Sequence, residues 1–271
     1  MRVAGRAGLV QTTRMLLALI ACTSTPGELL DETFTDDAGV EGKVALVVPS
    51  LGDSNDALGV LLFFSWDFGN SFYKEEAELH AKVAREHGLV VASMASPRTG
   101  TDDGCWWAPR VEDNAAFVDQ FVRERLVSGL GVDPERVFTT GLSGGSDFAA
   151  AFHLHTGFRY GGGAVALCGG DVPRSNGGAC DPEADPEEAP SPSDLSHSDL
   201  GRVRYDFAIV ADDELLENSK EAAAYYEGLG FENVRHRVVE GAGHCGFTSG
   251  WEGLDVFAEG LDYVDSQAAQ D

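Results

Sequence analysis

The 271-residue chain is poor in basic side chains: it has 19 lysines and arginines against 45 aspartates and glutamates, which gives a formal net charge of −26 at pH 7. A surface this acidic repels phosphate backbones and anionic lipid headgroups. We therefore expect no nucleic-acid partner. Hydrophobic residues make up 43% of the chain, so the acidity does not indicate disorder, and the length is enough to bury a substantial core.

The chain also lacks any apolar run near the ~18 residues that a membrane-spanning helix needs. Its N-terminal residues 1–22 carry three arginines and no acid, and they end in a short apolar run, Met15–Ala21, followed by Cys22. This pattern predicts an export signal. The stretch Leu19–Cys22 resembles the lipobox of bacterial lipoproteins, so we expect an exported protein, extracellular or anchored to the membrane by a lipid on Cys22.

Cysteines are few, five in total. If Cys22 is lipidated, an even number remains: Cys105, Cys168, Cys180 and Cys245. An even count in an exported protein favours two disulfides, and three pairings are possible. A bond between Cys168 and Cys180 would close a short loop.

The middle of the chain alternates strand-like and helix-like segments. Runs such as 60–64 are apolar without polar alternation, which is typical of strands buried on both faces. Such strands separated by helices predict an α/β fold, a mostly parallel central sheet with helices on both faces. The expected strands are 43–49, 59–66, 89–94, 136–140, 163–168, 205–211 and 234–239, and the expected helices are 73–87, 112–129, 144–155, 217–228 and 251–265.

The expected organisation has three parts. A signal peptide covers residues 1–22, a polar, acidic spacer covers 23–42, and one folded domain covers 43–271. Within the domain, residues 171–200 are rich in Asp, Glu, Pro and Ser, which predicts a surface loop. We find no internal repeat.

The segment Gly141–Gly145 has the pattern G-x-S-x-G, directly after a predicted strand and at the start of a predicted helix. A sharp turn between strand and helix forces the serine into a strained backbone conformation, and the flanking glycines remove the Cβ clashes that would forbid it. Ser143 is therefore our candidate nucleophile. A phosphate-binding loop is the alternative, but the lysine of a P-loop is missing.

A serine nucleophile needs a base, and the base needs an orienting acid. His244 lies between glycines in the loop after the last predicted strand, whereas the other six histidines fall on predicted helices, in the polar loop or within a strand. The acid should follow the preceding strand, where the sequence offers Asp212, Asp213 and Glu214. Asp213 is the first choice, and Glu214 is a serious rival.

These motifs, with the segment Val132–Val137 before the serine turn and Cys168–Gly170 after the next strand, resemble the α/β-hydrolases. The resemblance covers roughly residues 43–265 and is to the group of secreted feruloyl-esterase-like and poly(3-hydroxybutyrate)-depolymerase-like esterases. It implies an α/β-hydrolase fold and a serine carboxylic-ester hydrolase with the triad Ser143, Asp213 and His244, acting through an acyl-enzyme without metal or organic cofactor. The implied partner is a small-molecule or polymer ester, and we expect a monomer.

The oxyanion hole is where the sequence departs from this group. The backbone N–H of Gly144 is one expected donor. The loop that supplies the second donor often begins with His-Gly in such enzymes, but here it reads Ser65–Gly69, so the donor would be the N–H of Trp66 or Asp67. The irregular loop keeps open a non-catalytic, surface-anchored binding protein, and the triad alone does not exclude a peptidase or acyltransferase.

Two adjacent tryptophans, Trp106 and Trp107, fall in a loop at the predicted sheet edge where α/β proteins form their pockets. They would form a platform for an aromatic or sugar-bearing substrate, or one of them would pack beneath the loop. The sequence does not separate these two hypotheses.

Overall fold

The computed structural model describes residues 27–49, 57–97, 104–106, 111–172, 197–248, 250 and 253–266. The predicted export signal with Cys22, most of the polar segment 171–200 with Cys180, and Trp107 lie outside the described residues. No helix in the described part of the chain is long and apolar enough to cross a membrane.

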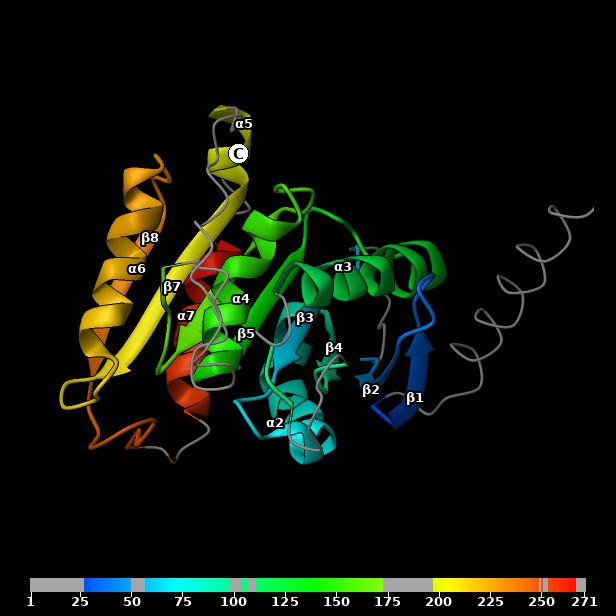
Figure 1. Ribbon diagram of the computed structural model, residues 1–271, viewed down its shortest axis with the longest axis horizontal. Coiled ribbons are helices and arrows are strands. Elements are labelled where there is room, and N and C mark those ends of the chain that lie inside the picture. The colour runs from blue at the N-terminus through cyan, green and yellow to red at the C-terminus, as the bar shows by residue number, and fades with distance from the viewer. Residues whose placement is uncertain are drawn as a thin grey trace, which may run out of the picture.

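A sheet of eight strands forms the centre of the fold (Figure 1). Its order is β1-β2-β4-β3-β5-β6-β7-β8; β2 runs antiparallel to both β1 and β4, and all other neighbours are parallel. The strands are β1 (Leu29–Thr35), β2 (Glu41–Val47), β3 (Gly59–Phe64), β4 (Leu89–Met94), β5 (Val137–Leu142), β6 (Gly162–Leu167), β7 (Val203–Val210) and β8 (Val234–Val239). The α/β architecture predicted from the sequence is confirmed.

Helices cover both faces of the sheet. The longer ones are α2 (Tyr73–Ala84), α3 (Val111–Phe121), α4 (Gly144–His155), α6 (Leu216–Gly228) and α7 (Leu254–Ser266). The shorter segments are η1 (Asn70–Phe72), η2 (Arg85–His87) and α5 (His197–Arg202), and η3 (Val122–Leu130) continues α3 with π-helical hydrogen bonds.

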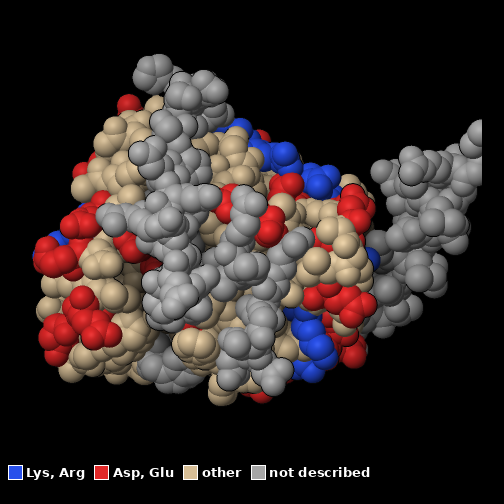
Figure 2. Space-filling view, in the orientation of Figure 1, with Lys and Arg blue, Asp and Glu red and all other residues tan. Residues whose placement is uncertain are grey.

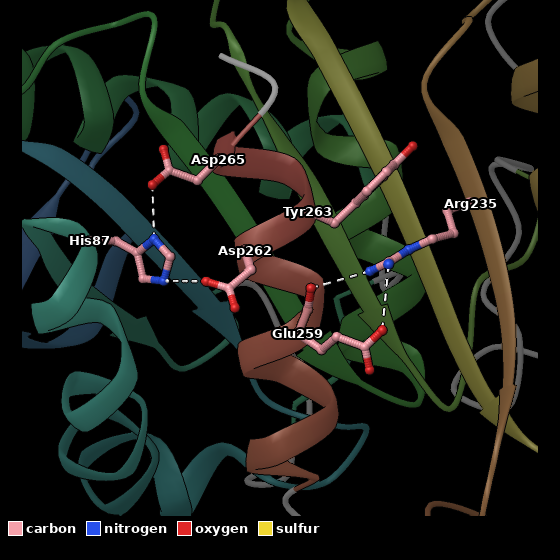
Figure 3. A pocket seen from close by; sticks show the side chains of 6 residues that line it. All are labelled: His87, Arg235, Glu259, Asp262, Tyr263 and Asp265. Atoms are coloured by element: carbon pink, nitrogen blue, oxygen red, sulfur yellow. Dashed lines mark hydrogen bonds and ion pairs between the residues drawn. The ribbon is translucent and has the colours of Figure 1, made fainter. Parts of the chain in front are cut away.

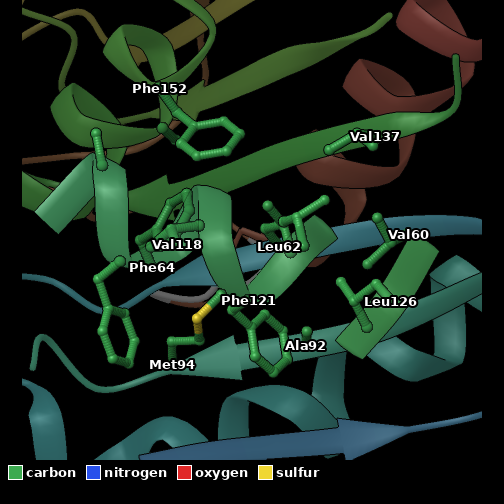
Figure 4. Close-up of a cluster of buried hydrophobic side chains, with 14 of the residues drawn as sticks. Val60, Leu62, Phe64, Ala92, Met94, Val118, Phe121, Leu126, Val137 and Phe152 are labelled. Carbon is green, nitrogen blue, oxygen red and sulfur yellow. The ribbon is translucent and has the colours of Figure 1, made fainter. Parts of the chain in front are cut away.

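Strand β3 shows how these layers are held together. Its side chains alternate between the two faces, as the period of two in a strand requires. Val60, Leu62 and Phe64 pack with α3 and α4 on one face (Figure 4). Leu61 and Phe63 pack with α2 and α7 on the other. All six residues of β3 are buried. This is why its sequence is a continuous apolar run without polar alternation, as predicted for a strand covered on both faces.

The predicted spacer over residues 23–42 is not a linker throughout, because β1 lies in the middle of it. This strand is at the edge of the sheet and pairs with β2 from Leu29–Val47 to Thr35–Glu41. Only Phe34 is fully buried, between the rings of Phe117 and Phe121. An edge strand exposes many of its side chains, and these can be acidic. The sequence of β1 therefore resembles that of a polar linker.

The acidic composition is visible on the surface. Asp and Glu side chains form several patches on the face shown in Figure 2, whereas Lys and Arg occur at few places. Several of the acids are paired: Asp31 with Lys74, Asp119 with Arg123 and Arg159, and Glu135 with Arg202. These pairs leave most of the negative charge uncompensated.

Candidate active site

Ser143 stands between β5 and α4, in a backbone conformation that L-residues rarely adopt, with φ 52° and ψ −127°. The two flanking glycines are required by close approach of other backbone atoms. A Cβ on Gly145 would lie 2.2 Å from the carbonyl oxygen of Phe64, and a Cβ on Gly141 would lie 2.5 Å from the backbone of Gly145. The G-x-S-x-G pattern is therefore a strained strand-to-helix turn, which lifts the serine out of the carboxyl edge of the sheet.

His244 comes to this serine from the loop after β8. Its Nε2 lies 2.9 Å from the Ser143 Oγ, although the two residues are 101 positions apart in the chain. The loop is closed by a bridge between Gly241 and Phe247, and it turns at Gly243, whose φ of 72° suits glycine. The glycines that singled out this histidine in the sequence thus shape the loop that carries it.

Asp213 lies behind His244, in the turn after β7. Its carboxylate oxygens are 3.0 and 3.1 Å from the His244 Nδ1, and its side chain is fully buried. The same carboxylate accepts hydrogen bonds from the backbone N–H groups of Leu215 and Cys245. Contacts with these three nitrogen atoms hold the carboxyl group in place and orient the imidazole through its Nδ1, so that Nε2 faces Ser143.

The neighbouring acids have other surroundings. Asp212 accepts a hydrogen bond of 2.8 Å from the Gly243 N–H, so it fixes the histidine loop through the backbone and does not contact the imidazole. Glu214 is exposed. Of the three acids that the sequence offered, the structure brings Asp213 to His244.

A disulfide between Cys168 and Cys245 ties the histidine loop to the end of β6. The short-loop pairing of Cys168 with Cys180 that the sequence allowed is therefore wrong. The two bonded cysteines are 77 positions apart, and Cys245 directly follows His244. Cys105 is also disulfide-bonded. The sequence left the pairing open because nothing local connects the ends of β6 and β8.

The other side of Ser143 is formed by the start of α4 and the loop after β3. Gly144 is the first residue of α4, where an N–H has no acceptor within the helix and the helix dipole favours negative charge. The carboxyl group of Asp67 packs against it: a Cβ on Gly144 would lie 2.4 Å from the Cγ and from both carboxyl oxygens of Asp67. Burial raises the pKa of Asp67 to about 6.

Aromatic side chains surround this loop. The ring of Trp66 lies over Gly69, at 5.2 Å from the ring of Phe72, while Phe68 and Phe72 are exposed. Trp106 is completely buried, stacked on Phe148, which favours the hypothesis that it packs beneath its loop. Which backbone N–H serves as the second oxyanion donor, Trp66 or Asp67, stays a prediction.

A further acid, Asp147, lies one helical turn after Ser143 and was not singled out in the sequence. It accepts a hydrogen bond from the backbone N–H of Gly170, in the loop after β6. Burial raises its pKa to about 7, while this hydrogen bond opposes the rise and the nearby Asp171 and Asp67 add to it. The sequence signal that could have identified Asp147 is its position, four residues after the serine in a helix that begins with small residues.

A hollow of about 480 Å³ lies elsewhere, beside the second half of α7 (Figure 3). His87 bridges Asp262 and Asp265 there, and the guanidinium of Arg235 lies 4.1 Å from the centre of the Tyr263 ring. His87 precedes β4 and Arg235 is near the start of β8, so this hollow is at the amino edge of the parallel strands. Ser143, Asp213 and His244 are at the opposite edge.

The described residues bring together one group with the geometry of metal ligands, Cys168, His244 and Cys245. The two sulfurs are bonded to each other, so neither is a thiolate that would bind a metal ion. The group does not fit a metal site.

Solved structures of esterases share this arrangement of strands and helices. An arylesterase superposes with a TM-score of 0.64 at 15% sequence identity, covering 97% of this chain and 92% of its own. A bacterial heroin esterase gives 0.64 at 19% identity, covering 95% and 90%, and a ferulic acid esterase gives 0.61 at 14%, covering 89% and 98%. The chain has the α/β-hydrolase fold. No protein-family model and no curated protein matches its sequence.

The α/β-hydrolase fold explains why the three side chains meet. In such a sheet the loops that follow β5, β7 and β8 lie at one edge, and each of the three follows one of these strands. Their order in the chain, serine, acid, histidine, is the order expected for the fold.

Proposed function

We propose that this protein is a serine carboxylic-ester hydrolase with Ser143, His244 and Asp213 as its catalytic triad. The observation that carries the proposal is the continuous chain of contacts, 2.9 Å from the Ser143 Oγ to the His244 Nε2 and 3.0 Å from the His244 Nδ1 to Asp213. The esterase structures with the same fold support this reaction class.

In the first half of the reaction, the Ser143 Oγ attacks the carbonyl carbon of the ester while the His244 Nε2 takes the hydroxyl proton. The carbonyl π electrons move to oxygen, and the N–H of Gly144 stabilises the oxyanion. Asp213 stabilises the imidazolium. The bond from carbon to the alcohol oxygen then breaks, and the imidazolium gives its proton to the leaving alcohol, which leaves Ser143 acylated.

In the second half, His244 takes a proton from a water molecule that attacks the acyl carbon. The tetrahedral intermediate collapses, the bond to the Ser143 Oγ breaks, and the serine oxygen receives the proton back from His244. The products are the free acid and the original enzyme. Every proton and electron pair is accounted for by substrate, water and these side chains.

The substrate class follows from the surroundings of the serine. The exposed rings of Phe68 and Phe72 lie on the loop that leads away from β3, which supports esters with an apolar or aromatic part. The uncompensated acidic surface disfavours anionic substrates.

We propose export as the setting for this activity. Disulfides persist in oxidising compartments, and three of the described cysteines, Cys105, Cys168 and Cys245, are disulfide-bonded. This supports the signal predicted for residues 1–22, with a lipid on Cys22 as the proposed anchor.

The test is hydrolysis of p-nitrophenyl butyrate by the Ser143→Ala variant. We expect kcat to fall by about 10⁴-fold or more, because the nucleophile is lost. Ser71→Ala is the matched control, since Ser71 is exposed on η1, and it should keep full activity. An equal unfolding midpoint for both variants shows that the fold is intact. Unchanged turnover by Ser143→Ala contradicts the assignment, and added peptide or alcohol acceptors reveal peptidase or acyltransferase activity.

A further inference from the structure

Asp67 is held close to the reacting serine by the backbone on both sides of it. The Gly69 N–H donates to the Trp66 carbonyl oxygen at 2.8 Å, which closes a tight turn around Asp67. The Phe68 N–H donates to the Gly104 carbonyl oxygen at 3.1 Å. Phe68 itself has a φ of 67°, a strained conformation for an aromatic residue. The turn therefore fixes the direction in which the Asp67 side chain points.

That direction is toward the start of α4. The carboxyl of Asp67 fills the space that a side chain on Gly144 would occupy, with all three of its heavy atoms 2.4 Å from the position of a Cβ. Gly144 directly follows Ser143, and its N–H is the donor expected to bind the oxyanion. The carboxyl thus packs against the residue whose N–H is expected to bind the oxyanion.

Among the described residues the carboxyl of Asp67 lacks partners. Its Oδ1 is buried and has no hydrogen-bond partner there, and burial, with no opposing lysine or arginine, accounts for its raised pKa. The acids nearby are Asp147 on α4 and, next to that, Asp171 in the loop after β6. A buried acid without a cation, near other acids, binds its proton more tightly than an exposed one.

The start of α4 stabilises negative charge through its free N–H groups and the helix dipole. An ionised Asp67 beside Gly144 would repel an oxyanion bound there, as two carboxylates repel each other at a shared site. A protonated Asp67 has an O–H to give. A carboxylic acid kept neutral by its surroundings donates a strong hydrogen bond to a developing oxyanion.

Building on the proposed function, we propose that Asp67 is a further catalytic residue, whose protonated side chain donates a hydrogen bond to the ester carbonyl oxygen as it becomes an oxyanion. The O–H bond of Asp67 is not broken in this step. The proton taken from Ser143 still goes to His244, and the new charge on oxygen is shared between the Gly144 N–H and the Asp67 O–H. Turnover requires a neutral Asp67 together with a neutral His244.

The proposal predicts a falling limb in the pH profile of kcat/KM for the unmodified protein. Activity falls as Asp67 loses its proton, and in this limb each rise of one pH unit lowers kcat/KM about tenfold. The burial that raises the pKa of Asp67 to about 6 sets where this fall begins in the free enzyme. A level plateau between pH 7 and 9 would overturn the proposal without any variant.

Two variants distinguish the effect of Asp67 ionisation from the effect of losing its hydrogen-bond donor. Asp67→Asn keeps a donor that does not ionise, so the falling limb should disappear and kcat/KM at pH 8 should exceed that of the unmodified protein by about tenfold or more. Asp67→Ala also loses the falling limb, but its kcat should be about 10²-fold below that of Asp67→Asn at pH 8, because the donor is gone.

Two results would contradict the role of Asp67 as a hydrogen-bond donor. If Asp67→Asn retains the falling limb, or if Asp67→Asn and Asp67→Ala have equal kcat at every pH, Asp67 has no role as a donor. Ser143→Ala is run beside them with p-nitrophenyl butyrate. If it matches the unmodified protein, the proposed function itself has failed; if it is inactive while the profiles of the Asp67 variants do not change, the failure belongs to Asp67 alone.

Discussion

Asp213 and Asp67 both bring a carboxyl to the surroundings of Ser143, Asp213 behind His244 and Asp67 over Gly144. The first accepts hydrogen bonds from His244 and from two backbone N–H groups. The second has a buried oxygen with no partner in the described residues. The two carboxyl groups therefore differ in how many hydrogen-bond partners surround them, and it is the poorly partnered, buried Asp67 whose pKa is raised.

The largest effect on activity is expected from a change of Asp213. Asp213→Asn should lower kcat by about 10⁴-fold, because an amide no longer keeps the His244 proton on Nδ1 or stabilises the imidazolium. Steady-state hydrolysis of p-nitrophenyl butyrate measures it. The neighbouring variant Glu214→Gln is the control and should stay within about twofold, since Glu214 is exposed. If Glu214→Gln is the damaging change, the orienting acid has been misassigned.

The disulfide beside His244 should have the next largest effect. Replacing Cys168 and Cys245 together by alanine should lower the free energy of unfolding by about 4 kcal/mol, the amount expected for a cross-link between residues 77 positions apart. Denaturant unfolding measures this loss. We also expect lower kcat, because His244 precedes one of the bonded cysteines. An unchanged unfolding midpoint would mean that the bond does not constrain the chain.

Asp67 should affect stability with a sign that depends on pH. Its folded pKa of about 6 lies above its unfolded value of 3.8, so the folded state binds this proton more tightly. The contribution of Asp67 to stability is therefore greatest at low pH and falls between pH 4 and 6, by at most about 3 kcal/mol. Asp67→Asn removes this cost, and we expect it to stabilise the protein by about 1–3 kcal/mol at pH 8 and by almost nothing at pH 4.

Urea unfolding at the two pH values checks this. The raised pKa of Asp147 also lowers stability as the pH rises to about 7. The free energy of unfolding of Asp67→Asn is therefore compared with that of the unmodified protein at the same pH. An equal change at pH 4 and pH 8 would show that the protonation of Asp67 is not involved.

Much of this site could be predicted from the sequence because its signals are local. The G-x-S-x-G pattern directly after a predicted strand marked the turn at Ser143, and the glycines around His244 marked a single loop, although the contacts that require Gly145 come from β3. The position of Asp213 followed from the rule that loops after parallel strands share an edge. Each of these signals could be recognised in a short stretch of sequence, without knowledge of which distant segments pack against it.

The other features of the structure depend on how distant segments pack together. The bond between Cys168 and Cys245 requires the ends of β6 and β8 to approach, and the surroundings of Asp67 depend on where β3 places its loop against α4. The edge strand β1 shows only one fully buried side chain, so its pattern resembles a linker. Each of these features comes from contacts between segments whose sequences carry no sign of one another.

The assignment of Ser143 as the nucleophile is tested most directly by labelling the intact protein with a fluorophosphonate, which forms a bond with activated serines. After labelling at pH 7, the peptides are mapped by mass spectrometry. We predict one modified serine, Ser143, with labelling lost in Ser143→Ala and strongly slowed in Asp213→Asn. Absence of labelling at Ser143, or labelling unaffected by the loss of Asp213, would contradict the account.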